Sequence, residues 1–251
     1  MKKQTILTAA VAAVFGLSIV GAANAAVTFG DGGTALQGVL DNITVAPVVG
    51  DSSVDVNTDQ LVNDKHWSIT GAGGSVASII VELAGFANQN TFGVYDSTNP
   101  GVGVQLFNGV AGAGDQVFMS IKIDGSVFVN NLDSGVDFAG NSFGYWLNTP
   151  QQNTWYSDSA LNLDGKDHLA AYLGTNTDTV QLPGLAAGLW TNNEYVMAWE
   201  DLSFNTGSDA DYTDFVVMVE SVKPIPEPGI LALMGLGLLG FMDRRRFTTK
   251  V

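Results

Sequence analysis

The stretch EYVMAWEDLSFNTGSDADYTDFVVMVE (residues 194–220) places two hydrophobic segments on either side of an acidic loop. In the first segment Tyr195, Met197 and Trp199 fall on one face, and the segment's two glutamates fall on the other. This period of two is typical of a β-strand, and residues 215–222 predict a second strand. An antiparallel hairpin of these strands would bring the two ends of the acidic loop together.

Short segments of the same kind recur along the chain between clusters of Gly, Asn and Asp. In residues 115–125, the side chains of Val117, Met119, Ile121 and Ile123 share a face. Residues 75–85 alternate likewise, and further strands are predicted at 67–70, 91–95, 102–107, 127–130, 143–147 and 169–173. No amphipathic pattern of helix length lies between them. About ten strands with Gly-rich turns predict an all-β fold, an antiparallel two-sheet β-sandwich of jelly-roll type.

The N-terminal end of the chain differs from this central region. Two lysines precede an apolar run at residues 6–20, and Ala23-Asn24-Ala25 presents small residues at a signal-peptidase site. We expect residues 1–25 to form a signal helix that is removed after Ala25. An uncleaved anchor is disfavoured because the apolar run is short. The mature chain would then hold one β-sandwich domain at 26–223 and a C-terminal segment at 224–251.

The charge balance of the 251-residue chain limits its partners. Its formal net charge is −15, and between the two ends its cations are Lys65, Lys122, Lys166 and Lys223. Such a surface repels phosphate backbones, which excludes nucleic-acid binding. Divalent cations outside the cell would offset this repulsion, although the charge could equally serve solubility alone. The chain has no cysteine, and a core from about 200 residues can be stable in an exported protein without disulfides.

Nucleophilic catalysis has little support in the sequence. The histidines are His66 and His168, and a G-x-S-x-G motif is absent. A pair of glycosidase carboxylates stays open, because its spacing is set in three dimensions. We therefore predict a protein without catalytic residues.

The acidic loop carries the most specific chemical signal. Glu200 and Asp201 end one predicted strand, and Asp209, Asp211 and Asp214 precede the next; these five residues are called the acidic cluster below. Like charges this close repel unless a cation neutralises them. Oxygen ligands without cysteine favour Ca²⁺ over zinc or copper, and the spacing does not match an EF-hand. The alternative is a solvated turn, which Asp also suits.

A second acidic patch lies in NLDGKDH (residues 162–168). Asp164 and Asp167 could supply a further Ca²⁺ site, although Asp-Gly is equally typical of a hairpin turn. We expect His168 to form local hydrogen bonds rather than to bind a metal.

Residues 143–158 are rich in aromatic side chains. Trp146, Trp155 and Tyr156 would stack on sugars if they were exposed, and the alternative is packing in the core. Tyr145 and Trp146 are adjacent, so on a strand they face opposite ways, and at least one lies outside the main core.

The acidic cluster, with the segments at residues 90–109 and 161–172, resembles a family of exported bacterial β-domains of unassigned function. Members end with a strand, a Glu-Asp pair, a loop and then D-x-D-[FY]-N-D before a final hydrophobic strand. The family is often regarded as Ca²⁺-binding, which implies Ca²⁺ at the five residues here. Thr213 stands where the family pattern has Asn, and its hydroxyl could support the same turn. The resemblance covers most of residues 80–222.

The C-terminal end is Pro226-Glu227-Pro228, an apolar run at 229–242, and then the arginines Arg244, Arg245 and Arg246. As a helix the run would rise about 21 Å, short of the roughly 30 Å of a bilayer core. This order resembles the PEP-CTERM sorting signal of Gram-negative bacteria, at which an exosortase is thought to cut. The resemblance implies transient insertion in the inner membrane with the arginines in the cytoplasm, and then delivery to the cell surface or extracellular polysaccharide.

These observations favour a non-catalytic, Ca²⁺-stabilised β-sandwich protein. Signal peptidase and exosortase would be its partners during export. The alternatives are a carbohydrate-binding module for matrix polysaccharide and, less favoured, a polysaccharide-acting hydrolase.

Overall fold

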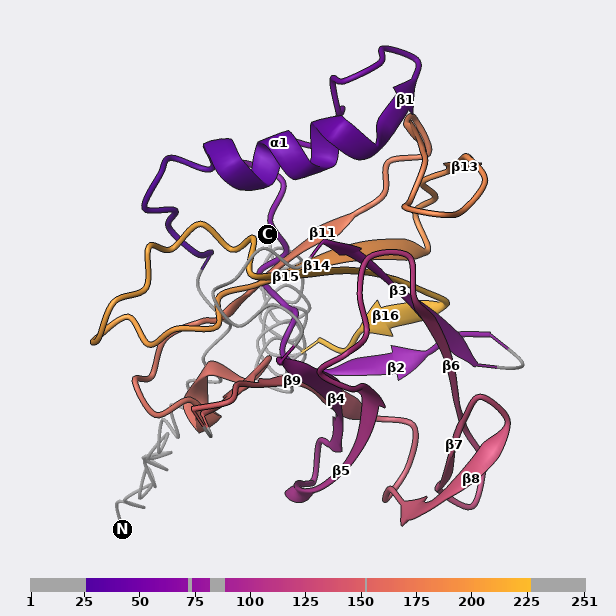
Figure 1. Cartoon of the computed structure of the whole chain (residues 1–251). Coiled ribbons are helices and arrows are strands. Elements are labelled where there is room, and N and C mark those ends of the chain that lie inside the picture. Colours follow the sequence, from indigo (N-terminus) through magenta and orange to yellow (C-terminus); the bar gives the residue numbers. More distant parts are fainter. Residues whose placement is uncertain (1–25, 72–73, 82–88, 152, 227–251) are drawn as a thin grey trace, which may run out of the picture. The chain divides into compact units, whose positions relative to one another are not determined.

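The computed structural model describes residues 26–71, 74–81, 89–151 and 153–226 (Figure 1). The expected signal helix at 1–25, with Ala25, lies outside the described residues. So do Glu227, Pro228, the apolar run at 229–242 and the three arginines. Among the described residues no helix has the length and apolar character needed to cross a membrane.

The largest sheet has seven antiparallel strands in the order β11-β14-β15-β3-β6-β7-β8. Its strands are β3 (Ser75–Val81), β6 (Gln116–Ile121), β7 (Ser126–Val129), β8 (Leu132–Asp137), β11 (Leu169–Leu173), β14 (Glu194–Trp199) and β15 (Phe215–Glu220). The predicted hairpin of residues 194–199 with 215–220 is confirmed, because β14 and β15 pair with Trp199 opposite Phe215.

A second antiparallel sheet has the order β16-β2-β9-β4-β5, and β10 also pairs with β9. Its strands are β2 (Trp67–Ile69), β4 (Thr91–Asp96), β5 (Asn99–Phe107), β9 (Phe143–Asn148), β10 (Thr154–Tyr156) and β16 (Val222–Pro224). Strand β16 crosses the expected domain boundary at residue 223, and the Ile225 amide donates to the carbonyl of His66. The sheet therefore includes the first residue of the expected C-terminal segment at 224–251.

The two sheets contribute side chains to one hydrophobic core. Phe92 of the second sheet lies near its centre, stacked on Tyr145 at 5.5 Å between ring centroids. From the seven-stranded sheet, Trp199 and Phe215 pack against the same ring at 6.0 and 5.1 Å. The fold is thus mostly β with antiparallel sheets, as predicted.

A third layer, which the sequence did not predict, covers the other face of the seven-stranded sheet. It consists of the helix α1 (Thr34–Ile43) and a small sheet of β1 (Thr44–Ala46), β12 (Thr179–Val180) and β13 (Gly188–Leu189). Figure 1 shows α1 and β1 on the side of β11 and β14 that faces away from β4 and β9. A second core of buried residues lies beneath this layer.

The expectation that the region holds no helix was therefore wrong. Helix α1 buries Leu36, Leu40 and Ile43, which recur at the helical spacing of four and three residues. Asp31 accepts hydrogen bonds from the amides of Gly33 and Ala35 and so caps the first turn. The helix has ten residues and contains Gly38, which weakens its intrinsic propensity and hides the pattern.

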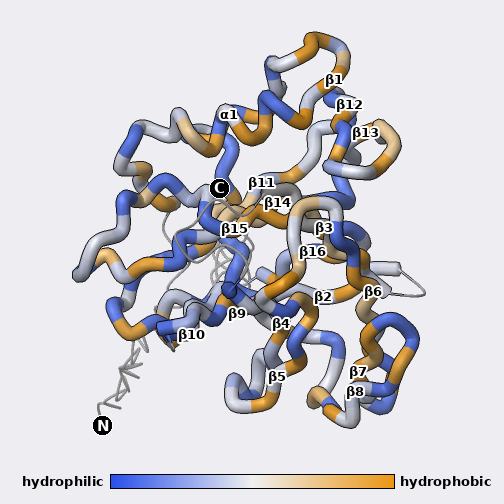
Figure 2. Tube along the Cα trace, viewed as in Figure 1, coloured by the Kyte–Doolittle hydropathy of each residue, from blue (hydrophilic) through white to orange (hydrophobic). Residues whose placement is uncertain are grey.

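The structure also differs from two details of the predicted strands. The face of β14 expected to be polar is buried, because Val196 and Ala198 pack in the second core. Figure 2 shows hydrophobic and hydrophilic residues alternating along α1, as expected of a helix that buries one face. Ile123 lies beyond the end of β6 and is fully exposed, because the chain turns there and the Gly125 amide donates to the Lys122 carbonyl.

The third layer should contribute strongly to stability. Leu40 is completely buried, so Leu40→Ala should lower the free energy of unfolding by about 2–5 kcal/mol. Urea denaturation followed by tryptophan fluorescence would measure the change. Leu163→Ala, at an exposed leucine, is the matched control and should stay within about 0.5 kcal/mol. Equal effects of the two changes would show that α1 does not pack as described.

Candidate metal centre

The acidic cluster forms at the end of the β14–β15 hairpin. Glu200 and Asp201 directly follow β14, and Asp214 directly precedes β15. Because Trp199 pairs with Phe215, these three residues meet where the two strands begin to part. The loop between them then carries Asp209 and Asp211 to the same place.

Carboxylate oxygens of the cluster lie close together in two groups that share Glu200. Glu200, Asp201 and Asp214 offer one oxygen each within 4.8 Å of one another. The same holds for Glu200, Asp209 and Asp211. All five predicted ligands are therefore brought together around one glutamate.

The centre of the cluster is buried and only partly hydrogen-bonded. Glu200 and Asp201 are 0 % and 2 % exposed. Asn90 donates its side-chain amide to Asp201 Oδ2 at 2.8 Å, and the Asp201 amide donates to Asp214 Oδ2 at 2.8 Å. Glu200 Oε1 accepts from the Leu202 amide at 3.2 Å, whereas Glu200 Oε2 has no hydrogen-bond partner within the described structure. A buried carboxylate oxygen without a partner is costly, and a bound cation would remove that cost.

The loop that carries Asp209 and Asp211 has an unusual backbone. Ala210 and Tyr212 have φ values of 56° and 57°, in the left-handed region that residues other than glycine rarely adopt. Thr213 donates from both its amide and its hydroxyl to Asp211 Oδ1, at 2.8 and 2.9 Å. The hydroxyl of Thr213 therefore supports the turn as expected. Strained backbone of this kind often marks a functional site.

Tyr212 anchors the loop in the protein interior. Its ring is buried and lies 5.3 Å from that of Phe29, and its hydroxyl donates to the Asp167 carbonyl at 2.7 Å. The Gly30 amide in turn donates to the Ala210 carbonyl at 3.0 Å. These contacts hold the loop at the N-terminal segment and fix the direction of its aspartates.

The electrostatics of the cluster follow from burial and mutual repulsion. Burial, with Asp201 and Glu200 nearby, raises the pKa of Asp214 to about 9. Burial and Asp209 raise the pKa of Glu200 to about 7, and burial also raises the pKa of Asp201. The ion pair of Lys65 goes to Asp158 rather than to this cluster. Hard oxygen donors at this density suit Ca²⁺, which takes six to eight such ligands.

Asp164 and His168 form a buried network beside the cluster. The His168 ring contacts Glu200 O through Nδ1 at 2.8 Å and Asp164 Oδ2 through Nε2 at 3.1 Å. Both ring nitrogens are therefore used in local hydrogen bonds, as predicted for His168. Asp164 Oδ2 also accepts from the Ser203 hydroxyl and the Phe204 amide, so Asp164 positions the loop that follows the Glu-Asp pair.

Asp164 and Asp167 lie outside the two carboxylate groups described above. Neither belongs to a group of three possible metal ligands among the described residues. Burial and Asp64 raise the pKa of Asp167. Asp164-Gly165 makes a turn, with Gly165 at a φ of 66°, but the turn is not a hairpin. The strands on either side, β10 and β11, belong to different sheets.

The three candidate sugar-binding aromatics have different environments. Trp155 is 1 % exposed and stacks on His168 at 3.8 Å between ring centroids. Its Nε1 donates to the Asp201 carbonyl at 2.7 Å, so Trp155 contacts the backbone of the acidic cluster rather than the surface. Trp146 and Tyr156 are half-buried. Tyr145 is buried in the core while Trp146 faces the other way, as their adjacency predicts.

Comparison with family models assigns two parts of the chain. Residues 112–222 match a domain of unknown function (DUF4114), and this match includes β14, the acidic cluster and β15. Residues 224–246 match the PEP-CTERM protein-sorting motif. Pro226, the first residue of its Pro-Glu-Pro sequence, is exposed in the structure. The motif identifies an exported protein that an exosortase processes at the membrane for the cell surface. No curated protein and no solved structure matches the chain.

The cluster should make the metal-free protein less stable as the pH rises. The pKa values of Glu200 and Asp214 are higher in the folded than in the unfolded state. The folding stability that these two groups contribute is therefore fully present below about pH 4, and it is lost as the pH rises toward about 9. We expect the Tm in chelator-treated buffer to fall between about pH 5 and about pH 9, measured by scanning fluorimetry. A constant or rising Tm over this range would show that the carboxylates are not buried together.

Proposed function

We propose that this chain is a non-catalytic, Ca²⁺-stabilised β-domain protein that is delivered to the cell surface or the extracellular polysaccharide matrix. We further propose that its two large sheets form a jelly-roll-like sandwich. The observation that carries the calcium assignment is Glu200: it is fully buried, belongs to both groups of carboxylates, and leaves Oε2 without a partner in the described structure. A hard divalent cation satisfies all three features.

In this proposal Glu200 lies at the centre of the site. Asp201 and Asp214 would bind from the strand ends, and Asp209 and Asp211 from the loop. The bound ion would neutralise repulsion within the cluster and fix the loop against the N-terminal segment. Its chemistry is structural, because the ion would hold two strands, a loop and the N-terminal segment together rather than activate a substrate.

Export follows the order implied by the two ends of the chain. We propose that signal peptidase removes residues 1–25 in a Gram-negative bacterium and that the apolar run at 229–242 then holds the chain briefly in the inner membrane. Exosortase processing at Pro226-Glu227-Pro228 would release the acidic domain. The PEP-CTERM match supports this route.

Thermal melting with Ca²⁺ tests the structural role of the ion. At a Ca²⁺ concentration about 100 times the Kd, binding adds about 2.7 kcal/mol, which raises the Tm by about 5–10 °C for a domain of this size. Glu200→Gln should raise the Tm in metal-free buffer, because it removes a buried charge, and should abolish most of the Ca²⁺-induced rise. A higher metal-free Tm together with a smaller Ca²⁺-induced rise would identify Glu200 as a ligand rather than as a merely structural residue.

The matched control is Asp137→Asn, which removes a carboxylate from exposed strand β8. It should leave both the metal-free Tm and the response to Ca²⁺ unchanged. An unchanged Tm of the natural protein in saturating Ca²⁺ would refute the calcium assignment.

A carbohydrate-binding module is the alternative, and the position of Trp146 favours it. Its half-buried indole packs directly over Gly93 and Gly103, where an added Cβ would meet the ring at 2.4 and 3.3 Å. The Nε1 donates to the Val94 carbonyl at 3.0 Å, which fixes the ring plane on the sheet. A fixed aromatic ring of this kind can stack on a sugar.

A glycan array separates this alternative from the calcium proposal. If sugars bind on the sheet, Trp146→Ala should lose binding about tenfold or more, whereas Glu200→Gln should retain it in Ca²⁺-free buffer. Phe128→Ala, a half-buried aromatic on β7 of the other large sheet, serves as the control. The absence of glycan binding by the natural protein would refute the carbohydrate-binding alternative.

A further inference from the structure

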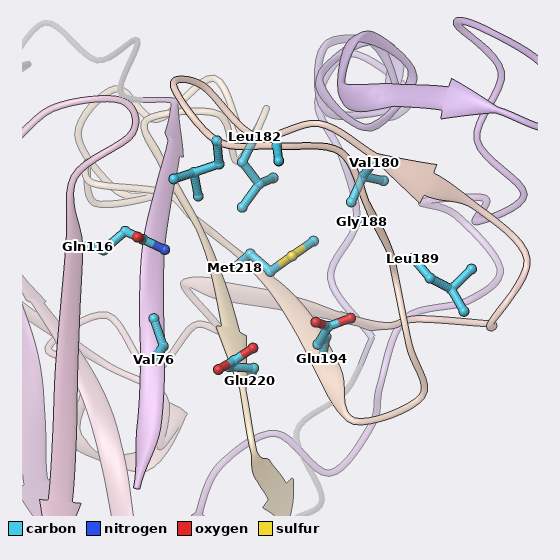
Figure 3. A pocket seen from close by; sticks show the side chains of 11 residues that line it. Val76, Gln116, Val180, Leu182, Gly188, Leu189, Glu194, Met218 and Glu220 are labelled. Carbon is cyan, nitrogen blue, oxygen red and sulfur yellow. The ribbon is translucent and has the colours of Figure 1, made fainter.

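A cavity of about 320 Å³ lies between the seven-stranded sheet and the segment that contains β12 and β13 (Figure 3). One wall is the face of β3, β14 and β15 that points away from the main core, and the other wall is formed by residues 180–189. The larger apolar side chains that line it are Val76, Val180, Leu182, Leu185, Leu189 and Met218. The cavity therefore combines apolar side chains with polar groups, at a size that suits a small organic ligand.

Two carboxylates line the same cavity. Glu194 and Glu220 stand directly opposite each other in the register of β14 and β15. In Figure 3 their side chains lie next to each other, below Met218 and Leu182. Glu194 Oε2 accepts a hydrogen bond from the Thr191 amide at 2.5 Å, which fixes that carboxylate. Burial and the neighbouring Glu194 raise the pKa of Glu220.

Like charges directly opposite each other on neighbouring strands destabilise a sheet. None of the described residues that line the cavity is basic, so the chain itself does not neutralise the pair there. Among the described lining residues, Gln116 supplies the one other polar side chain. A cation from outside would offset the repulsion, and the apolar walls would favour one that carries an apolar body.

We propose that this cavity binds a small organic cation, an ammonium group on a short aliphatic chain. The ammonium would lie between the carboxylates of Glu194 and Glu220, and the chain would pack against Met218, Leu182 and Val76. A calcium ion suits this place less well than the acidic cluster, because two carboxylates and one amide supply at most five of its six to eight oxygen ligands. The cavity is thus chemically distinct from the acidic cluster.

Hexylammonium is the probe, and hexan-1-ol and hexanoate are comparators of the same shape. Titrations of the full β-domain in saturating Ca²⁺, followed by NMR chemical shifts, should show saturable binding of hexylammonium. Hexan-1-ol should bind at least about tenfold more weakly, because a charge-assisted interaction is lost, and hexanoate should not bind. Calcium is present throughout so that the acidic cluster does not compete for the probe.

Glu194→Gln and Glu220→Gln should each lower the affinity for hexylammonium at least about tenfold. Asp137→Asn on β8 should leave this affinity unchanged. Both glutamine variants should melt no lower than the natural protein, because each removes a like-charge contact. The absence of saturable binding to the natural protein would overturn the proposal. Equal binding of the three probes, or unchanged affinity in both glutamine variants, would also overturn it.

Discussion

The pairing of β14 with β15 is the constraint on which the rest of the structure depends. Alternate residues of these strands enter the two cores: Trp199 and Phe215 pack against the second sheet, whereas Val196 and Val216 pack beneath α1. Strands buried on both faces carry nearly continuous hydrophobic runs, which these two do. The same register fixes where the hairpin ends, and so determines which carboxylates meet there. Stability and chemistry are therefore set by one strand pair.

Neighbouring side chains hold the acidic cluster together against the repulsion between its carboxylates. Trp155 binds the Asp201 carbonyl and stacks on His168, which contacts the carbonyl of Glu200. Both backbone groups of the Glu-Asp pair are thereby fixed by buried aromatic rings. A cluster of like charges would otherwise spread apart, so these contacts preorganise the carboxylates before any ion arrives. A preorganised site binds more tightly because less ordering remains for the ligand to impose.

The sequence predicted the parts of the site that are close along the chain. The alternation in residues 194–199 and the acidic loop after them sufficed for the hairpin and for the meeting of its five acids. Asn90 could not be predicted, because its bond to Asp201 spans 111 residues and a single Asn has no periodic signal. Trp155 was left open between sugar stacking and core packing, because an aromatic residue looks the same in sequence whether it is buried or exposed. Helix α1 was missed because it is short, contains Gly38 and forms only where the sheet offers it a second hydrophobic face.

The hairpin also separates two groups of carboxylates whose surroundings differ in chemistry. Glu194 and Glu220 pair at one end of β14 and β15, and the acidic cluster begins just past the other end. Six residues of extended strand span about 20 Å. Two unit charges at that distance interact by only about 0.2–0.8 kcal/mol for effective dielectric constants of about 80 to about 20, so a charge bound at one end has a small effect at the other. The end enclosed by loops is rich in oxygen and suits a hard ion. At the other end, beneath β12 and β13, apolar side chains surround just two carboxylates, and an organic cation fits such a cavity better. One strand pair would thus hold the two proposed cation sites, distinguished by what lies beside the carboxylates.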